Sequence, residues 1–291
     1  MRAVKLYSTG DIRTVDVDVP SPAKDEILIK VEAAGICGTD RHLYHGEFPS
    51  VPEKILGHEF SGIVMDSGQT DIPEGARVTC DPNTWCGACS QCQRGRVNLC
   101  INNLATGIHR DGGFAEFCVF PASKAVVLPD KINPLYGAFC EPLACTLHGM
   151  DMGAAQEGET VLVIGGGVIG LMAVQLAKLA GAKVLLLTRS PEKQTLGLNI
   201  GADYAVGTES DVRDIWPEGA DLVVECAGVS ATVTLSHKLA RSGGRVVILG
   251  VISQGEQVPI EPFDMLFREI PVSYTHLRAH ETVLDLVCRL L

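Results

Sequence analysis

The sequence predicts an α/β protein with two domains, in which a β-rich N-terminal half precedes a parallel sheet flanked by helices. Three observations support this fold class. Short, alternating strand-like runs open the chain, a strand, glycine turn and helix follow one another within residues 161–180, and later apolar runs recur at the spacing of a βαβ unit. With 291 residues, the chain is long enough for two ordinary domains with separate cores.

The first predicted strands cover residues 3–7, 14–19 and 26–31. The last run alternates cleanly between apolar and polar residues, which is typical of a strand with one buried and one solvated face. These runs predict an antiparallel β region at the start of the chain.

The C-terminal half is built around residues 161–170, where four apolar residues lead into a G-x-G-x-x-G motif at Gly165, Gly167 and Gly170. One glycine makes the turn, one lets the backbone approach a pyrophosphate, and one lets the helix pack on the strand. The start of the helix then offers free N–H groups to phosphates. Because further apolar runs follow, this context favours a dinucleotide site over a plain strand-to-helix turn. The other candidate cofactor contacts here are Val168, Ile169, Leu249, Gly250 and Val251.

Charge and hydropathy exclude several classes of function. The net charge is −11 and no block of lysine or arginine occurs, which opposes binding to nucleic acid or to an anionic membrane. No apolar run is long enough to span a bilayer, and no secretory signal precedes the first strand. The simplest interpretation is a soluble cytoplasmic protein. Four of its eleven cysteines crowd into one short loop, which metal binding explains better than disulfides.

Four cysteines form a compact motif. Cys86, Cys89, Cys92 and Cys100 have the spacing C-x2-C-x2-C-x7-C, which can wrap one tetrahedral zinc ion without an open position. An iron–sulfur site or two disulfides are the alternatives. A closed zinc site of this kind stabilises the fold and performs no chemistry. Cys80 is off the spacing and is predicted to bind no metal.

A second candidate metal site combines Cys37, His58 and Glu59, a ligand mixture suited to zinc with a position left open. Taken singly, the cysteine fits a small buried hydrophobe and the His-Glu pair a hydrogen-bonded loop feature. Glu141, before a proline, is either a carboxylate in the first turn of a helix or the last partner of this open site.

Together these motifs resemble the zinc-dependent medium-chain dehydrogenases, in the branch of sorbitol and other polyol dehydrogenases and threonine dehydrogenase. The resemblance extends to about Pro271 in the family's order. The segments that carry it are 35–40, 57–59, 86–100, 111–116, 141–144 and 165–170.

The resemblance implies a GroES-like catalytic domain at 1–145 and a Rossmann domain at 146–271, with a catalytic zinc between them. Cys37 and His58 would bind that zinc with Glu59 or Glu141, since members of the branch differ in the carboxylate used. Thr39 matches the hydroxyl that starts a proton relay, and His42 is placed to continue it. In this chemistry zinc polarises the substrate oxygen while the nicotinamide accepts a hydride.

The nicotinamide cofactor is inferred from the end of the second strand, about twenty residues past the glycines, where NAD-binding versions of the fold carry an acidic residue. Thr188 stands there, followed by Arg189 and Ser190, with Lys193 one turn further on. A cation and hydroxyls suit a 2′-phosphate and favour NADP over NAD. The alternative is that Arg189 is a solvated loop residue and that NAD binds without an acidic partner.

Residues 272–291 do not match the family pattern, whose members normally continue for several dozen residues. Their apolar positions fit one face of a terminal helix. The favoured interpretation is a non-native tail joined to a truncated reading frame. Truncation would impair the dimer or tetramer that the family implies and predicts poor solubility and weak activity.

The sequence therefore favours a zinc-dependent, NADP-preferring dehydrogenase of a secondary hydroxyl in a polyol or sugar, with a small-molecule alcohol as its partner. The rival within enzymes is oxidation of threonine at its 3-hydroxyl. A third possibility is a non-catalytic cofactor-binding protein, similar to the zinc-lacking quinone reductases and crystallins.

Overall fold

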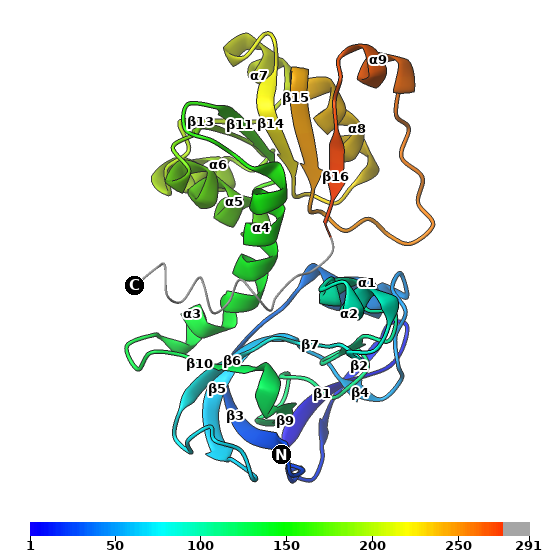
Figure 1. Ribbon diagram of the computed structural model, residues 1–291, viewed down its shortest axis with the longest axis vertical. Coiled ribbons are helices and arrows are strands. Elements are labelled where there is room, and N and C mark those ends of the chain that lie inside the picture. The colour runs from blue at the N-terminus through cyan, green and yellow to red at the C-terminus, as the bar shows by residue number, and fades with distance from the viewer. Residues whose placement is uncertain (276–291) are drawn as a thin grey trace. The chain divides into compact units, whose positions relative to one another are not determined.

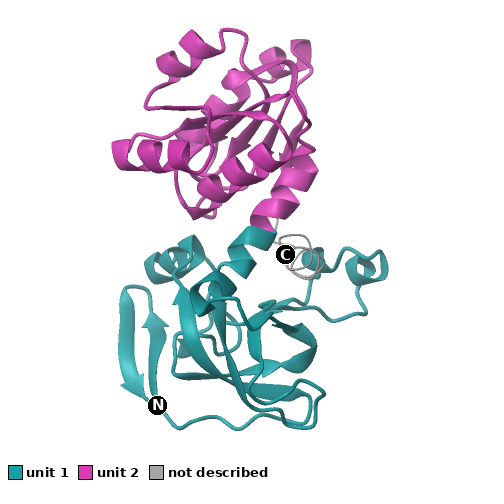
Figure 2. Cartoon of the chain, turned by 90° about the vertical axis from the view of Figure 1, so that its left-hand side faces the viewer, with its two compact units in different colours: residues 1–144, 277–291 teal, residues 145–276 magenta. Residues whose placement is uncertain are grey.

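The computed structural model describes residues 1–275 and divides them into two compact units that meet between Ala144 and Cys145 (Figure 2). The boundary expected from the sequence follows residue 145. The helix α4 (Cys140–Gly153) begins in the first unit and ends in the second. Residues 276–291, most of the predicted tail, lie outside the described part.

Unit 1 is built on a five-stranded sheet whose neighbouring strands are all antiparallel. In spatial order its strands are β10 (Ala125–Val127), β6 (Arg77–Cys80), β5 (Glu59–Asp66), β3 (Glu26–Gly35) and β9 (Phe117–Pro121). The predicted alternation in β3 is present, because Ile27 and Ile29 are fully buried and pack with Phe60 and Phe120 in one core.

Smaller elements complete unit 1. A three-stranded sheet has the order β2 (Asp11–Asp16), β1 (Arg2–Ser8) and β4 (Lys54–Ile55), and a two-stranded one pairs β7 (Asn83–Thr84) with β8 (Leu104–Ala105). The helices are α1 (Gly38–His45), α2 (Ser90–Gln93) and α3 (Pro134–Ala138), with short 3-10 turns η1 (Val97–Leu99) and η2 (Ala122–Lys124).

The second strand differs from the prediction, which placed it at residues 14–19. It begins at Asp11, because Gly10 adopts the left-handed conformation with φ of 75° and turns the chain back directly onto β1. Leu6 of β1 then pairs with Ile12 of β2, and the pairing ends at Asp16 opposite Arg2. Turn geometry, which propensity does not reveal, therefore sets the register.

Unit 2 is a six-stranded, fully parallel sheet with helices on both faces (Figure 1). In spatial order the strands are β13 (Tyr204–Val206), β12 (Lys183–Leu187), β11 (Thr160–Ile164), β14 (Ala220–Glu225), β15 (Ala240–Ile248) and β16 (Val272–Tyr274). The helices that connect or follow them are α5 (Val168–Leu179), α6 (Pro191–Asn199), α7 (Glu209–Ile215), α8 (Ser230–Leu239) and α9 (Pro262–Phe267). This order, 3-2-1-4-5-6 along the chain, is that of a doubly wound dinucleotide-binding sheet and confirms the predicted fold class.

Two clusters of buried residues cover the two faces of this sheet. Ala173, Val174 and Ala177 of α5 pack on one face, while Val212 of α7 and Val233 of α8 belong to the cluster on the other. The near-continuous apolar runs seen in the sequence are explained by this double burial.

Residues 272–274, which the sequence placed at the start of the predicted tail, form β16 and pair in parallel with residues 246–248 of β15. Among the described residues, no helix is long and apolar enough to cross a membrane.

Candidate active site and metal centres

Three of the predicted metal ligands are brought together by the pairing of β3 with β5. Gly35, the last residue of β3, stands opposite Glu59, the first residue of β5, so Cys37 lies beside His58 and Glu59. One ligand atom from each of the three residues falls within 4.8 Å of the others. A Cβ at Gly35 would collide with the Glu59 carboxylate and displace it, so glycine here leaves that carboxylate beside Cys37.

The chain reaches His58 through a tight turn at Gly57. Its φ of 92° is left-handed, and a Cβ there would collide with the ring of Phe114. His58 is 4% exposed, so its imidazole is removed from bulk water. The sequence motif Gly-His-Glu thus encodes both the turn and the ligands that follow it.

Asp40 is a site residue to which the sequence analysis assigned no role. It is buried in the first turn of α1, and its Oδ2 accepts a hydrogen bond from the backbone N–H of Cys37 at 2.9 Å. Its Oδ1 lies 3.8 Å from Nδ1 of His58, and within the described chain neither atom has a hydrogen-bond partner. The signal for this role is its place three residues after Cys37, where it can bond the helix N-terminus and still face the histidine.

The electrostatics of the cluster fit a cation. Burial, followed by the negative charge of Glu59 and that of Glu141, raises the pKa of the Cys37 thiol far above its usual range. Burial likewise raises the pKa of Glu59, against the opposing effect of His58. A metal ion at this point would stabilise the thiolate and the carboxylate together, so the donor set present is suited to one.

The other predicted residues of this site occupy different positions. Glu141 is buried in the first turn of α4 and stands near enough to act on Cys37, but it is outside the group of three. The backbone N–H and the hydroxyl of Thr39 lower the pKa of the Cys37 thiol, against the larger effect of burial. His42, one turn further along α1, pairs through Nδ1 with the carboxylate of Glu47 at 2.7 Å.

The four cysteines of the second motif form a compact sulfur cluster. The Sγ–Sγ distances are 3.5 Å for Cys89 to Cys92, 3.5 Å for Cys86 to Cys100, and 3.9 Å for Cys89 to Cys100. Four thiolates around zinc at about 2.3 Å have edges of about 3.8 Å. Every cysteine in the described part is free, which excludes the disulfide alternative there. Backbone N–H groups of Cys92 and Ile101 lower the pKa of Cys89 to about 6, which favours its thiolate.

The glycine motif lies at the carboxyl end of β11. Gly165 has a left-handed φ of 108°, and a Cβ on Gly170 would collide with the carbonyl oxygen of Gly165. Gly167 is the N-cap of α5, makes no side-chain cap and faces open space. This helix N-terminus therefore offers a cradle suited to a pyrophosphate. Val168 and Ile169 form its first turn.

Two of the residues expected at a 2′-phosphate, Thr188 and Lys193, lie beside Gly166. A Cβ there would lie 2.9 Å from Oγ1 of Thr188 and 3.0 Å from Cβ of Lys193. Ser190 caps α6 by accepting the backbone N–H of Lys193, and Arg189 is exposed. Across the sheet, the segment of Leu249, Gly250 and Val251 follows the carboxyl end of β15. A separate cavity of about 430 Å³ in unit 1 is lined by none of these residues.

Comparisons with known proteins agree with this arrangement. Residues 23–130 match the family model of the alcohol dehydrogenase GroES-like domain, and residues 168–290 match that of the zinc-binding dehydrogenases. A sorbitol dehydrogenase of Halalkalibacterium halodurans is 34% identical over 261 residues, which cover 86% of this chain and 76% of that protein. An L-threonine 3-dehydrogenase of Bacillus licheniformis is 36% identical over 248 residues, covering 81% of this chain and 71% of that protein.

Solved structures show the same fold. A zinc-binding dehydrogenase from Sinorhizobium meliloti bound to NADP is 52% identical, with a TM-score of 0.94, and the match covers 99% of this chain and 88% of that one. The rspB alcohol dehydrogenase of Escherichia coli in complex with NADH is 27% identical, with a TM-score of 0.91 and coverage of 100% and 87%. The chain belongs to the zinc-dependent medium-chain alcohol dehydrogenases, in the branch that contains polyol and threonine dehydrogenases, and is an NAD(P)-dependent oxidoreductase of that family.

Proposed function

We propose that this enzyme oxidises a secondary hydroxyl of a polyol or sugar alcohol and prefers NADP as the hydride acceptor. The observation that carries the proposal is the convergence of Cys37, His58 and Glu59 within 4.8 Å on a chain that also has the glycine cradle at Gly167. The similarity to sorbitol and D-arabinitol dehydrogenases supports a polyol as substrate. The small-molecule substrate, a cytoplasmic location and a homo-oligomeric state are parts of the same proposal.

Two zinc sites belong to this proposal. Cys37, His58 and Glu59 would hold the catalytic ion, with Glu141 as the alternative carboxylate, and the cluster of Cys86, Cys89, Cys92 and Cys100 would hold a structural one. When bound, the catalytic zinc supplies Lewis acidity to the substrate oxygen, and the nicotinamide accepts the hydride. Asp40 would orient the imidazole of His58 through Nδ1, because ligand histidines generally donate their second nitrogen to such a carboxylate.

The proton of the substrate hydroxyl would leave through side chains of α1. Thr39 would accept it, since its hydroxyl is in the first turn of α1, two residues after Cys37, and acts on the pKa of that thiol. His42 would continue the route toward solvent, and Glu47 holds its ring at 2.7 Å.

The preference for NADP is supported by the residues between β12 and α6 and by those in the first turn of α6. Thr188 and Ser190 offer hydroxyls, Arg189 and Lys193 offer positive charge, and positions 188–190 contain no carboxylate that would repel a 2′-phosphate. The similar Sinorhizobium meliloti structure bound to NADP also supports it. NAD is the alternative.

Threonine is the second candidate substrate, favoured by the 36% identity to the Bacillus licheniformis enzyme. A panel of polyols and L-threonine, assayed with NADP and NAD alongside zinc content per chain, separates the candidates. Two zinc ions and the highest kcat/KM for a polyol with NADP would support the proposal. Turnover of threonine alone would replace the polyol, and one zinc ion per chain would contradict a working catalytic site.

A further inference from the structure

Glu225, the last residue of β14, is a buried carboxylate with no part in the proposed chemistry. Its exposed fraction is 0%, and its neighbours in the sheet are Ile164 of β11 and Ile248 of β15. In the described part of the chain its side chain is held by hydrogen-bond donors and by no cation. Moving a carboxylate out of water costs free energy unless hydrogen-bond donors replace the lost water. The residues that supply these donors are therefore the ones that Glu225 holds in place.

The donors to the carboxylate come from the loop after β14 and from the first turn of α8, while the loop after β15 bonds to the backbone of Glu225. The carboxylate accepts the backbone N–H of Ala227 at 2.8 Å and of Gly228 at 3.0 Å, and the hydroxyl of Thr232 at 2.7 Å. Gly250 packs directly against this carboxylate, because a Cβ on Gly250 would lie 2.5 Å from Oε2 of Glu225. The carbonyl oxygen of Glu225 accepts the N–H groups of Leu249, at 2.8 Å, and Gly250, at 3.0 Å.

These two loops also pack on each other and on the glycine turn. A Cβ on Gly165 would lie 3.0 Å from the nitrogen of Ala227, so the turn and the loop after β14 touch. A Cβ on Gly228 would lie 2.5 Å from the carbonyl oxygen of Val251, so the loops after β14 and β15 touch as well. Glu225 therefore lies where the segments that follow β11, β14 and β15 pack against one another.

The carboxyl edge of a doubly wound sheet is where a dinucleotide binds. We propose that Glu225 is a positioning residue for the nicotinamide cofactor, holding the segments 226–228 and 249–251 in their binding geometry before the cofactor arrives. The inference rests on the proposed function, since it takes NADP(H) or NAD(H) as the ligand. Its physical basis is preorganisation, because loops that must be ordered during binding weaken the observed affinity.

The substitution Glu225→Gln tests this role. The amide keeps the shape of the side chain but replaces one acceptor oxygen with a donor, which then faces the backbone N–H groups. We expect the dissociation constant of NADPH, measured by fluorescence, to rise about tenfold to a hundredfold, as for one lost charge-assisted hydrogen bond. Amide hydrogen exchange should accelerate in 226–228 and 249–251. Thr232→Val, which removes one donor, should change both readouts in the same direction by a smaller factor.

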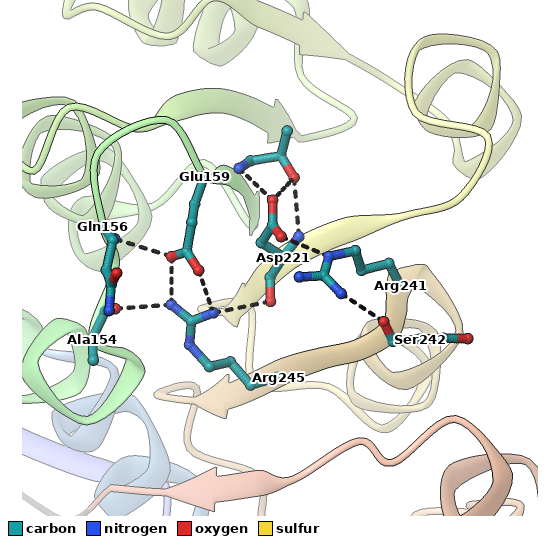
Figure 3. A network of polar contacts seen from close by, with 8 residues as sticks. Ala154, Gln156, Glu159, Asp221, Arg241, Ser242 and Arg245 are labelled. Atoms are coloured by element: carbon teal, nitrogen blue, oxygen red, sulfur yellow. Dashed lines mark hydrogen bonds and ion pairs between the residues drawn. The ribbon is translucent and has the colours of Figure 1, made fainter.

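Asp221→Asn is the matched control. Asp221 lies four residues earlier in the same strand, near its N-terminal end and away from the cofactor cradle. It accepts hydrogen bonds from Thr160 and Arg241 (Figure 3). This variant should lose thermal stability without any change in the NADPH dissociation constant.

Two results would overturn the inference. If Glu225→Gln lowered the melting temperature as Asp221→Asn does, but left NADPH affinity and exchange in 249–251 unchanged, Glu225 would serve stability alone. Were Glu225→Gln unable to fold, an unchanged affinity in Thr232→Val would have the same meaning. If the unsubstituted chain bound neither NADPH nor NADH, the proposed function would fail and take the cofactor role with it, while hydrogen exchange would still show whether Glu225 orders these loops.

Discussion

At the residue scale, the candidate metal site depends as much on residues that cannot bind metal as on those that can. Gly35 and Gly57 provide the space and the turn that bring Cys37 to His58, and Asp40 faces the imidazole from α1. Cys37 is the N-cap of α1, His58 directly precedes β5 and Glu59 is its first residue. The residues that position the ligands are therefore as necessary to the site as the ligands themselves.

Substituting Cys37 with Ser is expected to abolish turnover, because a neutral hydroxyl replaces the soft ligand of zinc. Binding of NADPH should be unchanged, since the cofactor cradle lies in unit 2. Steady-state kinetics and fluorescence titration measure the two effects. Activity equal to that of the unsubstituted enzyme would remove Cys37 from the mechanism.

The substitution Asp40→Asn should lower zinc affinity at the catalytic site by about 10- to 100-fold, the usual effect of losing the carboxylate behind a ligand histidine. Asparagine can still accept the N–H of Cys37, so α1 should keep its start. Competition with a chelating dye measures the affinity. Asp18→Asn, on an exposed residue, is the control and should leave zinc affinity unaltered.

Replacing Arg189 with Ala tests the cofactor preference. Loss of one cation beside a 2′-phosphate should weaken NADPH binding by about tenfold or more and leave NADH binding nearly unchanged. Arg213→Ala, on an arginine of α7 paired with Glu209, is the control. Equal changes for both cofactors would show that Arg189 does not discriminate between them.

At the element scale, the segment that carries the cysteine cluster has little secondary structure of its own. Within the described chain it contains the single turn α2, the 3-10 turn η1 and the two-residue strands β7 and β8. Such a segment buries few apolar side chains, so a metal ion would supply much of its stability. Substituting one of its cysteines is therefore expected to impair folding before it affects catalysis.

Cys89→Ser is predicted to reduce zinc content from two ions per chain to one and to lower the melting temperature. The reason is that three thiolates hold a structural zinc ion less tightly than four. Zinc analysis and thermal unfolding measure both effects, with Cys37→Ser as the comparison, in which zinc falls but the melting temperature changes less. An unaltered zinc content in Cys89→Ser would contradict a four-cysteine site.

At the scale of the whole molecule, polar contacts join segments that are far apart in sequence. The guanidinium of Arg245 in β15 binds the carboxylate of Glu159 before β11 and the carbonyl oxygen of Ala154 after α4 (Figure 3). It also donates to the carbonyl oxygen of Gly153, the last residue of α4. Asp221 accepts the N–H and the hydroxyl of Thr160 nearby. This network ties together the N-terminal ends of β11 and β14, at the end of the strands opposite the cofactor cradle.

The network predicts a dependence of stability on pH. The hydrogen bond to Arg245 holds the pKa of Glu159 below its ordinary value. The stabilisation is therefore complete above the unfolded pKa of about 4.3 and is lost as the pH falls through the lower, folded pKa. Glu159→Gln should cost about 1–3 kcal/mol at neutral pH and flatten the fall of the melting temperature between about pH 5 and pH 3. The exposed Glu256→Gln should leave that profile as it is, and an identical slope in Glu159→Gln would contradict the assignment.

The doubly wound sheet, the glycine turn and the candidate ligands could be predicted from the sequence, because buried parallel strands need continuous apolar runs and because metal ligands and tight turns each require particular residue types. Three features came from the folded structure alone: Glu59 rather than Glu141 lies within 4.8 Å of Cys37 and His58, Asp40 faces the histidine, and β2 starts at Asp11. Those outcomes depend on strand register and turn closure. The role of Glu225 is of the same kind, since its partners come from loops separated in sequence and are brought together by the order of the strands.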